Sequence, residues 1–258
     1  MKIGVQLFTV RKQANKNLFL TLKELSEMGI KYVEAARIPF DANTADTFVN
    51  AEEAFGTKVV STQIKMCKLE EEYDKIVSFH KKVGCSSAII SVLPTQYIVG
   101  EDHMLNVFCR KASELAKRYA GDGIQLSYHH HDFEFIKSGN ITRYDILTDN
   151  LTGVKLVLDT YWLTKAGKSV PNVIKKYSGR IEGLHLRDYA LVRKLISRTP
   201  KDYAVGEGVI DFAEIIECAK LNGVKYGAIE QNTKKPFEEL QKSISNLKKL
   251  GYKDMFNR

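Results

Sequence analysis

The sequence lacks the features that mark several large classes of protein. It has no apolar run long enough to span a bilayer, and its four cysteines, Cys67, Cys85, Cys109 and Cys218, form no CxxC pair. It therefore gives no sign of a zinc knuckle or a dithiol redox motif, and scattered thiols fit a reducing compartment. The start, "MKIGVQLFTV", is a strand pattern and not a signal peptide. We expect a cytoplasmic protein without a membrane partner, although a signal peptide removed beforehand would leave no trace in this sequence.

Blocks of like charge are also absent. The 258 residues carry 39 Lys and Arg against 31 Asp and Glu, a formal net charge of +8. A basic balance can indicate nucleic acid, a membrane surface or a phosphorylated substrate as the partner. Here lysines alternate with acids, as in "KLEEEYDK" and "FEELQKSISNLKKL", and no basic motif accompanies them. The charge favours a solvated, lysine-rich surface over a nucleic-acid binding site.

What the chain does contain is a regular alternation of strand and helix patterns. The predicted strands are 3–8, 30–35, 58–64, 87–93, 124–130, 154–159, 181–186 and 226–230. The predicted helices are 18–28, 45–55, 70–83, 103–119, 141–147, 170–177, 212–221 and 237–250. Eight strand–helix units in about 250 residues predict an α/β protein with a (β/α)8 TIM barrel.

The rival fold is a doubly wound open sheet, which would expect a glycine-rich phosphate loop after the first strand. That position reads "FTVRKQANKN", with neither GxGxxG nor GxxxxGK[ST]. No linker rich in Pro, Gly or Ser divides the chain, so we expect a single domain over residues 1–258. The longest stretch expected to be irregular, 187–210, follows the seventh strand, and loops of that length usually carry function.

Polar residues close the predicted strands, and in a barrel that edge holds the active site. Four of the six histidines lie at two strand ends, at positions 129, 130, 131 and 185. Asp159, His185 and Glu230 close three consecutive strands, so they converge. Carboxylate and imidazole ligands suit Mn²⁺, Zn²⁺, Co²⁺ or Mg²⁺. Each residue alone could be structural, but burying such groups together without a partner is costly, which favours a metal or substrate site.

The side chains of the fifth strand alternate in direction. His129 and His131 point to the same side of the strand and His130 to the other. If His129 faces a metal, His131 lies close enough to bind the substrate or the metal itself.

Six motifs carry a resemblance to a known family. "GVQLFTVR", "YHHHDFEF", "LDTYW", "HLRD", "VGEGVIDF" and "AIEQN" run from residue 4 to about residue 232. In this order they resemble the sugar phosphate isomerase/epimerase family of the xylose isomerase-like TIM barrels. The superfamily also includes inosose dehydratases, ketose epimerases, hydroxypyruvate isomerases and apurinic endonucleases, so the motifs do not select one reaction.

The resemblance implies a divalent metal held by residues that end strands five to eight. Asp159, His185 and Glu230 match three of the family's ligands. The strand-five ligand is commonly a Glu in an "LENH"-like segment, which reads "YHHH" here, so His129 takes its place and His131 matches the following His. The two-glutamate proton shuttle of the epimerases therefore keeps only Glu230. Its second member would have to be His131, His129 or Glu134.

We expect a metal-dependent sugar or sugar phosphate isomerase or epimerase that removes a proton next to a carbonyl and stabilises an enediolate. The metal ligands expected are His129, Asp159, His185 and Glu230, and the expected partner is a small carbohydrate, with homo-oligomerisation left open. The catalytic candidates are Glu230, His131 and Glu134. The substrate-binding candidates are Gln6, Glu34, Gln63, Trp162 and Arg187, with Gln63 near a place where relatives often have His.

Three other functions stay open. A keto-sugar or inosose dehydratase, or a lyase, could use the same site. A metal-free sugar-binding barrel fits the replacement of the usual glutamate by His129. An apurinic endonuclease is disfavoured, because relatives of that kind have a His shortly after the strand-six Asp, and "DTYWL" has none.

Overall fold

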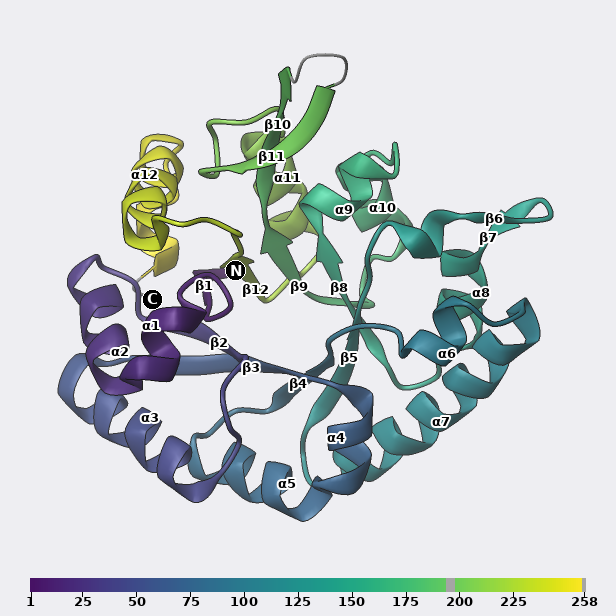
Figure 1. The fold of residues 1–258 in the computed structure, drawn as a ribbon, viewed down its shortest axis with the longest axis horizontal. Coiled ribbons are helices and arrows are strands. Elements are labelled where there is room, and N and C mark those ends of the chain that lie inside the picture. The colour runs from purple at the N-terminus through teal and green to yellow at the C-terminus, as the bar shows by residue number, and fades with distance from the viewer. Residues whose placement is uncertain (194–197, 257–258) are drawn as a thin grey trace.

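The computed structural model describes residues 1–193 and 198–256. Within them, eight parallel strands close into a barrel in the order β1-β12-β9-β8-β5-β4-β3-β2. The barrel strands are β1 (Lys2–Gln6), β2 (Tyr32–Ala36), β3 (Lys58–Ile64), β4 (Ser87–Ile90), β5 (Gln125–His129), β8 (Lys155–Asp159), β9 (Ile181–Leu186) and β12 (Tyr226–Ile229). Figure 1 shows helices around the outside of these strands. The predicted (β/α)8 barrel is confirmed.

The helices follow the strands in chain order. They are α1 (Arg11–Lys16), α2 (Leu18–Glu27), α3 (Ala42–Phe55), α4 (Met66–Glu71), α5 (Tyr73–Lys82), α6 (Thr95–Ile98), α7 (Asp102–Gly121), α8 (Arg143–Asn150), α9 (Thr160–Lys165), α10 (Val170–Lys176), α11 (Phe212–Leu221) and α12 (Pro236–Lys249), with 3₁₀ turns η1 (Phe133–Phe135) and η2 (Lys253–Phe256). In the part of the chain that the structure describes, no helix is long and apolar enough to span a bilayer.

Burial on both faces explains why the strands read as continuous apolar runs. All six residues of β9, "IEGLHL", are buried, because the helices cover one face and the barrel interior takes the other. Inside the barrel, Ile89, Val157, Tyr226 and Ala228 form a small separate cluster. Gly183 makes room for the Tyr226 ring there, since a Cβ atom at position 183 would lie 2.3 Å from that ring.

The segment 187–210 was predicted to be irregular, and that prediction is wrong. It contains an antiparallel ribbon of β10 (Asp188–Arg193) and β11 (Arg198–Tyr203), which rises above the barrel in Figure 1. The Asp188 carboxylate accepts hydrogen bonds from the backbone N–H groups of Tyr189, Gly206 and Gly208. Charged residues and a proline interrupt the apolar pattern of these strands, so periodicity alone does not reveal them. Residues 194–197 of the predicted loop lie outside the described residues.

The boundaries of three other predicted elements also differ from those in the structure. The predicted helix 70–83 is divided into α4 and α5 around Glu72. The predicted strand 87–93 ends at Ile90. The predicted helix 141–147 starts later, because β6 (Lys137–Ser138) pairs with β7 (Ile141–Thr142), and Thr142 then forms a capping box with Asp145 at the start of α8. Asp211 caps α11 as expected, accepting from the N–H groups of Ala213 and Glu214.

The packing of α5 against β3 gives a prediction for acid stability. His80 is buried, its Nδ1 donates to the Cys85 carbonyl at 2.8 Å, and its Nε2 lies 2.8 Å from the Thr62 hydroxyl. Burial lowers the pKa of His80 to about 4, from 6.5. Between about pH 6.5 and pH 4, His80 is therefore protonated in the unfolded chain but neutral in the folded chain. The free energy of unfolding falls as the pH drops through this range.

We expect His80→Gln to lose less stability than wild type between pH 7 and pH 4.5, by about 2 kcal/mol. Urea unfolding at both pH values measures the difference. The control is His103→Gln, because the His103 side chain is 68% exposed. An acid-induced loss in His80→Gln as large as that in wild type would contradict the prediction.

Candidate metal centre

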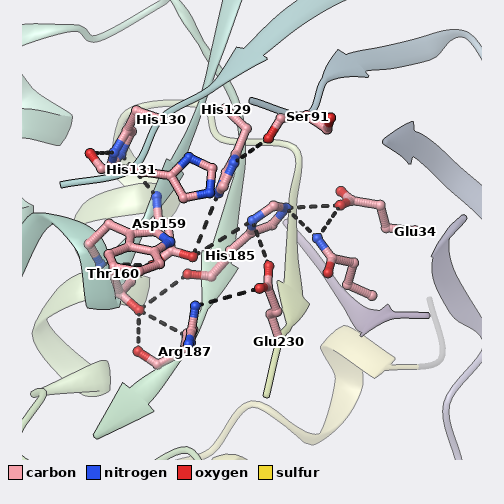
Figure 2. Close-up of polar contacts among 12 residues, drawn as sticks. Glu34, Ser91, His129, His130, His131, Asp159, Thr160, His185, Arg187 and Glu230 are labelled. Atoms are coloured by element: carbon pink, nitrogen blue, oxygen red, sulfur yellow. Dashed lines mark hydrogen bonds and ion pairs between the residues drawn. The ribbon is translucent and has the colours of Figure 1, made fainter. Parts of the chain in front are cut away.

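Four buried side chains converge where β5, β8, β9 and β12 end. His129 and Asp159 are the last residues of β5 and β8, His185 lies on β9, and Glu230 follows β12 directly. One potential ligand atom from each lies within 4.8 Å of the others. The strand register produces this meeting, since Asp159 pairs with His185 and the Glu230 N–H donates to the Leu186 carbonyl. Figure 2 shows the four side chains pointing toward one another.

Each imidazole has its outer nitrogen held as a donor. His185 Nε2 lies 2.9 Å from Glu34 Oε1, and His129 Nδ1 lies 3.1 Å from the Ser91 carbonyl oxygen. Because a carbonyl oxygen only accepts, the proton of neutral His129 is on Nδ1. The inner atoms, His129 Nε2 and His185 Nδ1, therefore present lone pairs to the cluster when the rings are neutral, as metal-binding histidines do.

Each of the two carboxylates likewise has one oxygen held outside the cluster and one oxygen that faces it. Asp159 Oδ1 accepts from the Trp162 N–H at 2.9 Å and caps α9, which leaves Oδ2 facing the cluster. Asp159 Oδ2 lies 3.7 Å from His129 Nε2 and 3.8 Å from His185 Nδ1. Glu230 Oε2 lies 3.1 Å from His185 Nδ1, while Oε1 is turned to Arg187.

The inner atoms of three of these residues have no hydrogen-bond partner among the described residues. They are His129 Nε2, Asp159 Oδ2 and His185 Nδ1, and all are buried; the last lies 3.1 Å from Glu230 Oε2, but without the angles of a hydrogen bond. Leaving such groups unpaired costs roughly 1–3 kcal/mol each. Metal–ligand bonds of about 2.0–2.2 Å place tetrahedral ligands roughly 3.3–3.6 Å apart. Three of the ligand pairs here, at 3.1, 3.7 and 3.8 Å, come close to that spacing, and all four ligand atoms lie within 4.8 Å of one another. The donor set of two imidazoles and two carboxylates thus fits a divalent cation.

Glu34 lies on the opposite side of His185 from the cluster. It is fully buried and accepts from Gln6 Nε2 at 2.8 Å, Ser61 Oγ at 2.7 Å and Tyr226 Oη at 3.2 Å. Burial alone would raise the pKa of Glu34, but the His185 charge and the hydrogen bonds from His185, Gln6 and Ser61 lower it. Gln6 and Glu34, both predicted to bind substrate, are thus placed where they orient His185.

The two carboxylates also control the protonation of His185. Burial pulls the pKa of His185 down, but Glu34 and Glu230 raise it well above its usual value. The same contact with His185 lowers the pKa of Glu230, which burial alone would raise.

The two other histidines of "YHHH" face different surroundings. His130 accepts from the Asp159 N–H at 3.2 Å and packs against Phe135 and Tyr144. The His131 ring lies 4.8 Å from that of His129 and 5.2 Å from Trp162, measured between centroids. Burial, followed by the neighbouring His129, lowers the pKa of His131 to about 3, and its Nδ1 has no partner among the described residues. His131 is therefore a neutral ring beside the cluster.

Glu134, a predicted catalytic candidate, lies within the 3₁₀ turn η1 that follows β5. Its Oε1 accepts from Tyr128 Oη at 2.5 Å, and its Oε2 accepts from the His131 N–H at 2.9 Å. Burial raises its pKa to about 7, against the effect of these donors. Both oxygens are used in holding the chain at His131.

The remaining predicted residues differ in the contacts that they make around the cluster. Arg187 follows β9, with its guanidinium 5.1 Å from the centroid of the Trp162 ring on α9. Gln63, on β3, is half-buried and forms no side-chain hydrogen bond with a described residue. Two residues that orient the site had no predicted role: Ser91, whose carbonyl contacts His129, and Asp202, which binds Arg187. A backbone contact such as that of Ser91 leaves no signal in residue type, whereas the acidic Asp202 stood within the predicted functional loop.

The buried Glu34–His185 contact predicts a strong energetic coupling. We expect Glu34→Ala to destabilise the metal-stripped protein by about 3 kcal/mol, because it leaves buried donors without an acceptor. In the double variant Glu34→Ala/His185→Ala the loss should be well below the sum of the two single losses. Urea unfolding in EDTA measures all three, and additive losses would argue against the coupling.

Comparison with known proteins gives the fold a context. No family model and no curated protein sequence matches the chain. A sugar phosphate isomerase/epimerase from Parabacteroides distasonis ATCC 8503 is 18% identical over 97% of this chain and 93% of its own, with a TM-score of 0.77. The 3-keto-D-glucoside 4-epimerase YcjR from E. coli is 16% identical over 96% and 99%, with a TM-score of 0.70. The IolI protein, solved with a zinc atom, is 17% identical over 99% and 98%, with a TM-score of 0.68.

At these identities the likeness concerns the fold alone. The chain shares its closed (β/α)8 barrel with sugar phosphate isomerase/epimerase and xylose isomerase-like proteins, in agreement with its motifs.

Proposed function

We propose that the protein is a metal-dependent sugar isomerase or epimerase whose divalent cation is held by His129, Asp159, His185 and Glu230. The observation that carries the proposal is the set of buried inner atoms without partners, each on a residue whose other polar atom is already held. The zinc atom of the IolI protein and the names of the sugar-processing neighbours support it. Two nitrogen and two oxygen donors suit Zn²⁺, Mn²⁺ or Co²⁺ better than Mg²⁺.

The cation would supply Lewis acidity to a carbonyl oxygen and the neighbouring hydroxyl of a small carbohydrate. The chain's own residues would bind and orient that substrate. Trp162, whose ring lies 5.2 Å from that of His131, offers an aromatic surface for the C–H face of a sugar. Arg187 can donate a hydrogen bond to a substrate oxygen beside Glu230.

Three residues near the cluster could accept the proton that is removed from the substrate. Glu230 is occupied as a ligand, and both oxygens of Glu134 are bonded to Tyr128 and to the His131 N–H. The His131 ring lies beside the cluster, 4.8 Å from that of His129, and has a buried Nδ1 without a described partner, so we assign it the removal of the proton next to the carbonyl. Glu134 would hold His131 in place through its main chain.

The replacement of the usual strand-five glutamate also favours a second candidate. His129 leaves no second carboxylate on the expected opposite side of the substrate, so a two-carboxylate shuttle is unavailable. A dehydratase or lyase acting on a keto-sugar needs a proton acceptor on one carbon and a leaving group on the next, which a single base at His131 can serve.

The metal is tested directly. We expect purified protein to contain one divalent cation per chain and its Tm to rise on adding Zn²⁺ or Mn²⁺ after EDTA treatment. Asp159→Ala and His185→Ala should lose both responses. The control Asp211→Ala removes a carboxylate that caps α11 and should keep them. A wild-type protein without metal and without a metal-dependent Tm shift would refute the proposal.

The reaction is tested with a panel of ketoses and 3-keto-sugars in D₂O. We expect an isomer of the substrate that differs in mass only by the solvent deuterium it carries next to the carbonyl, detected by NMR and mass spectrometry. His131→Gln should slow its formation at least a hundredfold while metal content stays at the wild-type level. Loss of water or of an aglycone would replace the isomerase proposal by the dehydratase or lyase.

A further inference from the structure

Arg187 is held on two sides. One edge of its guanidinium binds the Asp202 carboxylate, with Nε 3.1 Å from Oδ2 and Nη2 3.2 Å from Oδ1. Its face lies over Tyr161, 4.3 Å from the ring centroid. The side chains of Arg187 and Asp202 are only 11% and 12% exposed, so this bidentate pair is shielded from water. Such a pair fixes a guanidinium in direction as well as in place.

The remaining nitrogen, Nη1, is turned to Glu230. It lies 3.7 Å from Glu230 Oε1, beyond hydrogen-bond distance. Figure 2 draws this ion-pair contact as a dashed line between the two side chains. An unrestrained arginine beside a buried carboxylate would normally form a close, bidentate ion pair with it. Here Asp202 occupies the edge that such a pair would use, so Glu230 Oε2 stays directed at His185 Nδ1.

Asp202 is well placed for this task because it joins three parts of the barrel edge. It belongs to β11, opposite Tyr189 on β10, and its Oδ2 also accepts from the Asn232 N–H at 2.8 Å. Asn232 follows Glu230 by two residues, and its side chain accepts from Arg11 Nη2 at 2.9 Å. The hydrogen bond from Asn232 to Asp202 thus connects the β10–β11 ribbon to the segment after β12 that carries Glu230.

We infer that Asp202 is a positioning residue that keeps Arg187 from pairing with Glu230 and so keeps Glu230 free for a metal ion. The inference rests on the proposed metal site and adds a residue of the β10–β11 ribbon to it. Without the Asp202 carboxylate, Arg187 should pair with Glu230 and metal binding should weaken. Removing Arg187 as well should restore metal binding.

The experiment titrates EDTA-stripped protein with Co²⁺ and follows visible absorption, which reports both affinity and coordination. We expect Asp202→Ala to bind Co²⁺ about tenfold more weakly than wild type, with an altered spectrum. Asp202→Ala/Arg187→Gln should return to within threefold of Arg187→Gln alone, which should bind at least as tightly as wild type. Asp211→Ala, the matched loss of a carboxylate, should leave Co²⁺ binding unchanged.

The outcomes separate this inference from the proposed function. Wild-type protein that binds no Co²⁺ overturns both. Wild-type binding with unchanged affinity in Asp202→Ala overturns this inference alone, as does a double variant as weak as Asp202→Ala, because the loss would then come from the Asn232 contact. Should Asp202→Ala fail to fold, Asp202→Asn removes the charge, keeps an acceptor for Asn232, and carries the same expectation and the same refutation.

Discussion

The interaction on which the site depends is the contact between Glu34 and His185 inside the barrel. A carboxylate there is costly to bury, and it is tolerated because Gln6, Ser61, Tyr226 and His185 all reach it. The contact fixes the ring of His185 and decides which of its nitrogens faces Asp159 and Glu230. The same strand ends then carry His129, held from outside by the Ser91 carbonyl.

Beyond that contact, each carboxylate of the cluster uses one oxygen for a contact outside the cluster and the other for a contact within it. Asp159 caps α9 with one oxygen and faces the cluster with the other, and Glu230 is turned to Arg187 with one oxygen and to His185 with the other. Residues bound on one side lose little further conformational entropy when a ligand takes the other side. This preorganisation is what a metal centre with defined geometry requires.

The sequence predicted the fold and the membership of the cluster, but not how the surrounding residues are used. Strand periodicity and the rule that barrel sites lie at carboxyl ends of strands were enough to single out Asp159, His185 and Glu230. Residue type could not show that Glu34 lies beneath His185 or that both oxygens of Glu134 are bonded, because such roles depend on the direction of side chains within the barrel. The β10–β11 ribbon was missed because its stability comes from strand pairing and from Asp188, not from an apolar repeat.

The close fit of Gly183 to the Tyr226 ring connects an inconspicuous position to the chemistry above it. Tyr226 fills the barrel interior and donates its hydroxyl to Glu34 Oε2. A methyl group added at position 183 would have to displace the ring, and with it one of the donors that make a buried Glu34 carboxylate tolerable. The added methyl group would meet the Cζ atom that carries this hydroxyl, so a steric clash at position 183 of β9 would act directly on the hydrogen bond to Glu34.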